Sequence, residues 1–369
     1  VAILEGLPLP YGELEHSILP ARMPGFAPRL LDDLGASGLV CWVGHGALGR
    51  GDGRIALYRR DRVPLLLEPP VEPADLDEVH RAILEHLRTR GASFLVELAR
   101  AAGSDVKLAA LEESLWDLVW AGLVTNDTFL PLRALTGGSG GKRGAGPRTA
   151  GGRWSLVADL VGAGGSPTER AHARATMLLA RWGVVTRDVV GIEALPGGFA
   201  PIQRVLREME DVGKVRRGYF VEGLGGAQYA APGAVDRLRA MRPDDRGDVL
   251  VLAATDPANV WGALVPWPAR DGAASGARRT TGAVVVLVDG VPVLWLERGA
   301  KRIVTFPAAD DARTFELAAK ALPRVAERRR GKALRVETID GEPARGSRFA
   351  DALRAVDFRG DVRGLSLEV

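Results

Sequence analysis

Residues 197–238 constrain the fold more than any other segment of this 369-residue chain. Two glycines are followed by apolar residues that recur every three or four positions, which predicts an amphipathic helix that Gly213 ends. The apolar face comprises Phe199, Ile202, Val205, Leu206, Met209 and Val212. Residues 214–221 and 228–230 then flank a glycine-rich turn at 223–226 and predict a β-hairpin. A helix followed by a basic hairpin is typical of a winged helix.

The same segment predicts a surface that contacts nucleic acid. In a winged helix the helix can lie in a groove of DNA and the hairpin along the backbone. The candidate contact residues are Arg204, Arg207, Lys214, Arg216, Arg217 and Tyr219. Tyr219 and Phe220 alternate across their strand, so only one of them can face DNA. The alternative is a unit that only packs, with Arg216 and Arg217 on a solvated strand edge.

The length of the chain predicts several domains, because a single hydrophobic core rarely grows beyond about 250–300 residues. Short units of helix and strand are followed by a C-terminal part that is rich in strands. The predicted fold class is therefore α+β, with tandem winged-helix modules followed by a β-barrel-like domain. The predicted domains are a winged-helix module with a basic wing (1–68), a helical winged-helix-type module (69–135), a Gly-rich basic linker (136–153), a winged-helix module (154–243) and a β-barrel-like domain with helical insertions (244–369).

The N-terminal module repeats the pattern of helix and hairpin. Residues 11–34 predict helical turns, and residues 39–43 and 54–58 predict two strands joined by a glycine-rich turn. Arginines make this hairpin basic, and Arg50 and Arg54 are its candidate phosphate contacts. A solubilising strand edge explains the same arginines equally well.

The second module is predicted to be helical. Residues 76–90, 94–102 and 108–122 predict three helices of the helix-turn-helix type. In the third of these helices, Trp116 and Trp120 are neighbours one turn apart. Core packing is the preferred interpretation of these tryptophans, and base stacking is the alternative.

The third module is predicted to begin with a helix at residues 166–182. Ser166 followed by Pro167 is typical of a helix N-terminus. The apolar periodicity of this helix predicts that Arg170 and Arg174 face the solvent.

Residues 136–153, TGGSGGKRGAGPRTAGGR, have the composition of a flexible linker. They do not form a phosphate-binding loop. Such a loop needs Gly six residues before Lys142, where Thr136 stands, and Ser or Thr directly after it, where Arg143 stands. The sequence therefore predicts no ATP site and no cofactor in this chain.

The C-terminal domain is predicted to be rich in strands. Its predicted strands lie at residues 249–253, 283–288, 291–296, 303–306 and 333–339. Asp289 and Gly290 form a two-residue hairpin signal, and residues 312–326 predict a helix. Residues 324–335 are the most basic segment, which a solvated helix end explains at least as well as a ligand site.

The overall charge excludes a polycation. The chain has 49 Lys and Arg against 46 Asp and Glu, a net charge of +3, so any nucleic-acid site must come from local clustering.

The single cysteine, Cys41, excludes an internal disulfide and favours a cytoplasmic location. No run of about 18 apolar residues predicts a membrane span. His80 and His86 do not share a helix face, so no metal site is predicted.

Four passages of the sequence are distinctive. They are LVTNDT at 123–128, GGRWSLV at 151–157, RRGYFVEGLGGAQYA at 216–230 and LAATDPANVWGALVPWP at 252–268. They resemble the C-terminal region of the large helicase-related (Lhr) family of superfamily 2 helicases. The resemblance implies tandem winged helices followed by a β-barrel. It also implies a DNA repair protein whose ATP-driven helicase core precedes this region and unwinds RNA:DNA or DNA duplexes. The N-terminal residues lack the basic start of a signal peptide, and we expect them to lie inside a longer protein.

The resemblance further implies a fold similar to that of AlkZ-type DNA glycosylases, and uracil-DNA glycosylase activity in some members. One departure concerns the Gln-x-Gln signature of the alkylpurine glycosylases. Gln203 and Gln228 stand alone in this sequence, which argues against excision of alkylated bases.

Three functions follow from these observations, and whether the chain is itself an enzyme stays open. The preferred function is a module of a bacterial, nucleoid-associated helicase that binds single-stranded DNA, DNA duplex or RNA:DNA duplex for the helicase core. The second is a uracil-type glycosylase, which needs a carboxylate to stabilise a cationic sugar and a pocket for an extruded base. Asp256 and Asp361 are the candidate carboxylates and Trp261 and Trp267 the candidate stacking residues, although turn and core roles are commoner. The third is a scaffold that makes the helicase a homo-oligomer.

Overall fold

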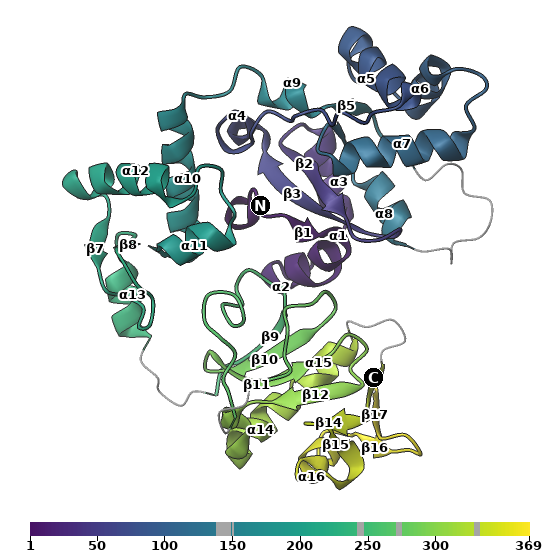
Figure 1. Ribbon diagram of the computed structural model, residues 1–369. Coiled ribbons are helices and arrows are strands. Elements are labelled where there is room, and N and C mark those ends of the chain that lie inside the picture. Colours follow the sequence, from purple (N-terminus) through teal and green to yellow (C-terminus); the bar gives the residue numbers. More distant parts are fainter. Residues whose placement is uncertain (138–148, 150, 242–246, 271–274, 328–332) are drawn as a thin grey trace. The chain divides into compact units, whose positions relative to one another are not determined.

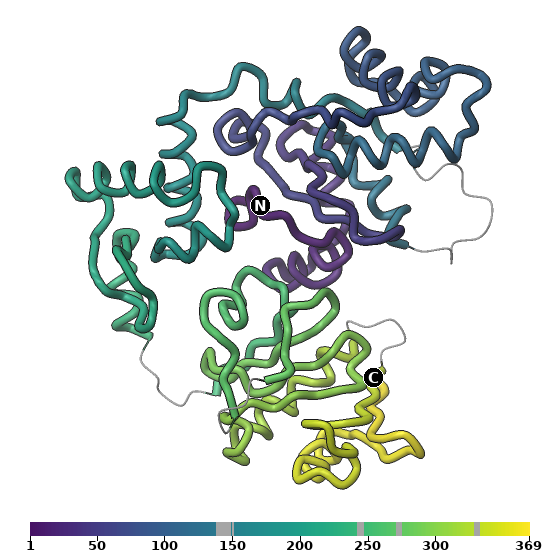
Figure 2. Tube along the Cα trace, viewed as in Figure 1, coloured from purple at the N-terminus to yellow at the C-terminus, as the bar shows by residue number. Residues whose placement is uncertain are grey.

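The computed structural model describes residues 1–137, 149, 151–241, 247–270, 275–327 and 333–369. The chain folds into two compact units (Figure 1). The first unit comprises Val1–Leu14 and Gly25–Arg237, and the second comprises Glu15–Pro24 and Leu238–Val369. Both combine helices with mainly antiparallel strands, which confirms the α+β class. The tube in Figure 2 allows the chain to be followed through both units.

The N-terminal module is built on a three-stranded antiparallel sheet of order β1-β3-β2. Its elements are the 3₁₀ turns η1 (Ala2–Leu4) and η3 (Arg60–Arg62), the strands β1 (Leu9–Pro10), β2 (Val40–Ala47) and β3 (Gly53–Arg59), and the helices α1 (Tyr11–Glu13), α3 (Arg29–Ala36) and α4 (Val63–Leu66). The β2–β3 hairpin confirms the two predicted strands. Gly53 is required there, because a Cβ atom at this position would lie 2.3 Å from the Trp120 ring.

The second module contains three helices, a short helix and a two-stranded sheet. Its elements are α5 (Glu78–Arg90), α6 (Leu95–Ala102), α7 (Leu108–Trp120), β4 (Val124–Asn126), α8 (Leu130–Thr136) and β5 (Trp154–Leu156). The three predicted helices are confirmed. Trp116 stacks on Trp120 with ring centroids 5.2 Å apart and meets the buried Trp154 edge-on at 6.0 Å. Packing is therefore the role that the structure gives to these tryptophans.

Strand β5 pairs with β4, although the sequence assigns residues 154–156 to the following module. Ser93 pairs with the other side of Trp154, and the Trp154 indole N–H donates to the carbonyl of Thr149 at 3.2 Å. Strands β4 and β5, which precede and follow the Gly-rich segment in the sequence, therefore belong to one two-stranded sheet. Residues 138–148 and 150 of that segment, with Lys142 and Arg143, lie outside the described residues. The exact module boundaries stay predictions.

The third module has the element order of a winged helix. It comprises α9 (Val157–Val161), α10 (Pro167–Trp182), β6 (Val184–Val185), α11 (Arg187–Ile192), α12 (Phe199–Asp211), β7 (Arg216–Gly218), β8 (Gln228–Ala230) and α13 (Ala234–Ala240). The strands form an antiparallel sheet of order β6-β8-β7. Ser166 caps α10 with Glu169, as its position before Pro167 indicates. The predicted helix and hairpin of residues 197–238 are confirmed.

The prediction that Arg170 and Arg174 face the solvent is wrong. Both side chains are at least 90% buried against the end of the N-terminal module. Arg170 donates to the carbonyls of Pro64 at 2.9 Å and Leu67 at 2.7 Å, and both arginines pair with Glu68. The two residues lie one turn apart on the face of α10 that packs on α4, where backbone carbonyls and a carboxylate satisfy the guanidinium groups.

The second unit is centred on a sheet of order β15-β14-β12-β11-β10-β9. Its strands are β9 (Val249–Ala253), β10 (Val284–Val288), β11 (Val291–Leu296), β12 (Arg302–Thr305), β14 (Thr338–Ile339) and β15 (Glu342–Pro343). Asp289 and Gly290 both have positive φ, at 48° and 83°, as a two-residue hairpin turn requires. A second sheet of order β13-β17-β16 contains β13 (Ala333–Val336), β16 (Arg359–Gly360) and β17 (Leu365–Glu368).

The second unit also contains short helical elements, some of which pack on its two sheets. They are the π-helical turn Leu14–Ile18, α2 (Leu19–Arg22), α14 (Ala312–Ala319), α15 (Leu322–Glu327) and α16 (Ala350–Arg354), with the 3₁₀ turns Pro307–Asp310 and Ala344–Gly346. Phe315 stacks on Phe349 at 4.2 Å in the main apolar core. The helix predicted at 312–326 is two helices, and Pro323 stands at the start of the second.

The predicted barrel is not found as a closed sheet among the described residues, because β9 and β15 end the large sheet without pairing with each other. The strand predicted at 333–339 divides between the two sheets at Glu337. The backbone N–H groups of Glu337 and Thr338 both donate to the carbonyl of Lys301, at 2.7 and 3.0 Å, which bends the chain from one sheet to the other. A barrel-like closure stays a prediction, and residues 328–332 of the basic segment lie outside the described residues.

Candidate nucleic-acid interface

The wing of the third module comprises residues 214–230, and one buried side chain, Gln228, holds it in shape. Its Oε1 atom accepts hydrogen bonds from the backbone N–H groups of Phe220 and Val221, both at 2.9 Å. Its amide nitrogen donates to the carbonyls of Val221 at 3.0 Å and Leu224 at 2.9 Å. The Gln228 side chain is fully buried. The Gln228 side chain thus accepts two hydrogen bonds and donates two. These four bonds replace the strand-to-strand hydrogen bonds that the wing lacks beyond β7.

The wing answers which of its two aromatic residues faces outward. Tyr219 is 91% exposed. Phe220 is half-buried, and its ring covers Gly218, where an added Cβ atom would lie 3.1 Å from the ring. Phe220 therefore packs on the wing itself, and Tyr219 is the ring that another molecule can reach.

The cations of the candidate interface are exposed. No described residue forms an ion pair with Arg204, Arg207, Lys214 or Arg216. Arg217 is the exception, since its guanidinium lies 3.4 Å from the carboxylate of Glu210.

The charge of α12 is balanced. Its outward face carries Arg204 and Arg207, but also the exposed Glu208 and Asp211. On the wing, Lys214 and Arg216 are accompanied by a single exposed acid, Glu222, and by Arg217 with its partner. The start of the wing is thus the most favourable part of this surface for a phosphate.

Arg50 and Arg54 lie in the first unit, but on the hairpin of the N-terminal module. Both side chains are exposed. Arg50 lies in the turn between β2 and β3, where Asp52 accepts from the backbone N–H of Gly53 at 2.8 Å. The structure therefore places the predicted cations of the first unit on α12, on the wing that follows it, and on the separate β2–β3 hairpin.

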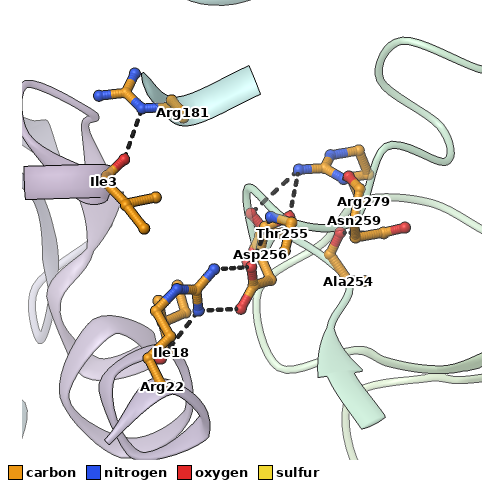
Figure 3. A network of polar contacts seen from close by, with 10 residues as sticks. Ile3, Ile18, Arg22, Arg181, Ala254, Thr255, Asp256, Asn259 and Arg279 are labelled. Carbon is orange, nitrogen blue, oxygen red and sulfur yellow. Dashed lines mark hydrogen bonds and ion pairs between the residues drawn. The ribbon is translucent and has the colours of Figure 1, made fainter. Parts of the chain in front are cut away.

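Asp256, in the second unit, has a buried and fully engaged carboxylate (Figure 3). Arg22 donates to both carboxylate oxygens, at 2.6 and 2.8 Å, and the backbone N–H of Ala258 donates to one of them at 2.7 Å. Arg279 holds the same turn by donating to the carbonyls of Thr255 at 3.1 Å and Asp256 at 3.3 Å. A bidentate ion pair and a turn hydrogen bond thus fix the carboxylate.

A hollow of about 470 Å³ lies beside this ion pair within the second unit. It is lined by Ala21, Arg22, Leu250, Leu252, Ala258, Val260, Trp261, Leu287 and Gly290. Trp261 is fixed by a hydrogen bond from its indole N–H to the carbonyl of Gly290 at 3.1 Å. Trp267 lies elsewhere, stacked on the buried Phe306 at 5.4 Å, which is a packing role.

Asp361 is half-buried in the turn between β16 and β17. Its carboxylate accepts from Ser366 Oγ at 2.7 Å and from the backbone N–H groups of Arg363 at 2.7 Å and Gly364 at 2.8 Å, and it pairs with Arg335 at 3.3 Å. The hydrogen bond from Ser366, followed by those from the backbone, holds the pKa of Asp361 below its usual value. No hydrogen bond or ion pair joins Asp361 to Asp256 in the described part of the chain, so the two carboxylates do not form one set.

The described ranges hold neither a metal-binding cluster nor a membrane-spanning helix. Within them, no three His, Cys, Asp or Glu side chains gather closely enough to hold a metal ion. No helix there is both long and apolar enough to cross a bilayer.

Sequence reasoning missed the residues that hold these features in place. In the sequence Gln228 is only an isolated glutamine, and no local pattern distinguishes Arg22 or Arg279 from the other arginines. A polar residue between the apolar residues of a short strand is the one signal that pointed to Gln228, whereas Arg22 meets Asp256 across 234 residues of sequence.

Comparison with known proteins gives two family matches, both to models described as "Large helicase-related protein, winged-helix domain". The model of the third such domain matches residues 1–60, and the model of the fourth matches residues 164–250. The matches fall on the first and third winged-helix modules of the structure.

Two curated relatives match nearly the whole chain. A Mycolicibacterium smegmatis protein named "Lhr helicase/ probable uracil glycosylase" is 41% identical over 369 residues, which is 92% of this chain and 24% of that protein. An Escherichia coli K12 protein named "Lhr helicase/uracil glycosylase" is 34% identical over 397 residues, which is 98% of this chain and 25% of that protein. The chain thus spans about a quarter of the length of these relatives. Among solved structures, the Streptomyces sahachiroi DNA glycosylase AlkZ aligns with a TM-score of 0.48 and 17% identity over 88% of each chain, a likeness too weak to carry an argument.

Proposed function

This chain belongs to the large helicase-related family, and we propose that it docks DNA for the helicase core of such a protein, chiefly through α12 and the wing of the third module. The observation that carries the proposal is the state of the wing. Its cations Lys214 and Arg216 are exposed and without an ion pair among the described residues, on a backbone that Gln228 fixes. A rigid, basic hairpin beside an exposed helix suits contact with phosphates along a duplex or a single strand.

The proposed partners follow from the same reasoning. DNA, as a single strand, a duplex or an RNA:DNA duplex, is the ligand, and the helicase core of the same protein is the second partner. A homo-oligomer stays an open alternative, as does an ATP site elsewhere in the protein. Docking of this kind would take place in the cytoplasm, at the nucleoid.

The test is binding of the whole chain to DNA as a function of salt. Loss of one phosphate contact lowers the slope of log K against log salt by about 0.9 for a duplex and about 0.7 for a single strand. Arg216→Ala is therefore expected to weaken binding and to reduce the slope by about this amount. Arg100→Ala, which removes another exposed arginine from α6, is the control and is expected to change neither. Equal effects of the two variants would overturn the proposal.

The hollow beside Arg22 favours a second candidate function, a uracil-type glycosylase. Its volume of about 470 Å³ falls within the usual range of small-ligand pockets, and Trp261 offers an aromatic wall to a base. In the reaction the glycosidic C–N bond breaks and the base leaves with the bonding electron pair, while a carboxylate stabilises the cationic sugar that remains. Water then adds to the sugar carbon, and the proton that it releases is taken up by the departed base. Asp256 and Asp361 are the candidates for this role, and Asp256 would have to give up its ion pair with Arg22, a residue that lines the hollow, in order to act there.

Strand cleavage at uracil tests this second candidate. The chain is incubated with uracil-containing single-stranded DNA and then treated with alkali, which breaks the backbone at an abasic site. Cleavage that is lost in Asp256→Asn or in Asp361→Asn, with DNA binding retained, would identify the carboxylate. Absence of cleavage by the unmodified chain would leave docking as its function.

A further inference from the structure

The most exposed aromatic ring of the wing has no role in the interactions described so far. Tyr219 is 91% exposed and forms no hydrogen bond or ring contact with the described residues. Burial of a tyrosine ring removes about 150–250 Å² of surface from water and is favourable, so a ring left in solvent at a fixed place is available to a partner.

The position of Tyr219 is restricted from both sides. Strand β7 ends at Gly218, which pairs with Gln228. The next two backbone N–H groups after Tyr219 are those that Gln228 holds, and the Phe220 ring packs on Gly218. Little backbone entropy remains to be lost at this point when the ring meets a ligand, and the cost of binding is chiefly that of ordering the side chain itself.

The surroundings of the ring identify the ligand. The exposed cations Lys214 and Arg216 precede Tyr219 in the sequence, and Arg217 lies between Arg216 and Tyr219. Cationic groups that follow a backbone, combined with an aromatic ring on which a base can stack, are the usual means of binding unpaired nucleic acid. In a uniform duplex the faces of the bases are covered by their neighbours, so a protein ring can stack only on an unpaired base or at the end of a duplex.

We infer that Tyr219 stacks on the first unpaired base at a junction of double- and single-stranded nucleic acid, so that the wing selects forked substrates over uniform duplex. The inference rests on the proposed docking function and adds the class of substrate to it. The helix α12 would take the paired side of the junction, as winged helices do, and the wing would take the point where pairing ends. A helicase region that binds such a junction would hold the substrate where unwinding begins.

The experiment measures binding of the whole chain to three fluorescently labelled DNAs of equal charge: a duplex, a fork, and the same fork with an abasic site as its first unpaired position. Base stacking is worth about 1–3 kcal/mol, so Tyr219→Ala is expected to weaken binding to the fork about 5- to 150-fold and to leave the duplex within about twofold. Tyr219→Trp keeps a ring and is expected to retain the preference for the fork. On the abasic fork, Tyr219→Ala is expected to have no further effect.

Arg216→Ala separates this inference from the docking proposal. If that variant weakens binding to all three DNAs while Tyr219→Ala changes none, or changes all three equally, docking stands and stacking is refuted. If Arg216→Ala has no effect, or if no DNA binds, docking fails and the inference fails with it. Tyr219 makes no contact on which the fold depends, so loss of folding does not confuse the result.

Discussion

Gln228→Ala is the perturbation whose consequences can be worked out most fully from the structure. The substitution removes four hydrogen bonds of 2.9–3.0 Å between the side chain and the wing backbone. At about 0.5–1.5 kcal/mol each, their sum is about 2–6 kcal/mol. The released backbone groups of the exposed wing regain hydrogen bonds with water. The free energy of local opening is therefore expected to fall by the lower end of this range, about 2 kcal/mol.

Hydrogen exchange of single amides measures this opening. The N–H groups of Phe220 and Val221 have Gln228 as their hydrogen-bond acceptor, and about 2 kcal/mol corresponds to exchange about 30-fold faster. The amides of α12 are expected to keep their exchange rates. DNA binding should weaken without a change in its salt slope, because no charge is removed.

Gln203→Ala, the same substitution at a half-buried position of α12, is the matched control. It is expected to leave the exchange of Phe220 and Val221 unchanged. Unchanged exchange of these two amides in Gln228→Ala would refute the reasoning, and so would a weakened binding accompanied by a smaller salt slope.

Two further predictions concern stability. Arg22→Ala leaves the buried Asp256 carboxylate without its guanidinium partner. In urea titrations it is expected to lower the free energy of unfolding of the second unit by about 3 kcal/mol. The double variant Arg22→Ala, Asp256→Asn should recover part of this loss. A loss below about 1 kcal/mol in the single variant would contradict the importance of the pair. Burial lowers the pKa of His45, so the unfolded chain binds a proton first, and the stability of the first unit is expected to fall as the pH drops from about 6.5 toward that lowered value. Urea midpoints at pH 7.5 and pH 5 measure this fall, and an equal fall in His45→Gln would exclude His45 as its cause.

The elements that local periodicity determines were predictable from the sequence. Helix α12 and its hairpin follow from apolar spacing, Gly213 and the glycine-rich turn, and the β10–β11 turn follows from Asp289-Gly290. The family was also within reach, since long passages of sequence such as RRGYFVEGLGGAQYA are characteristic of it.

The remaining features depend on contacts between distant segments. Nothing local in α10 distinguishes a solvated Arg170 from one that meets the carbonyls of Pro64 and Leu67. The division of the 333–339 strand depends on the carbonyl of Lys301, which is more than 30 residues away in sequence. The same holds for the site. Asp256 could be identified from the sequence as a candidate carboxylate, but its pairing with Arg22 arises only in the folded unit.

The most direct test of the central claim is a hydrogen-exchange footprint of the whole chain with and without a forked DNA at low salt. If the third winged helix docks DNA, exchange should slow in peptides that cover residues 199–221 and remain unchanged in the sheet strands at 284–305. Slower exchange confined to the second unit, with DNA demonstrably bound, would contradict the account.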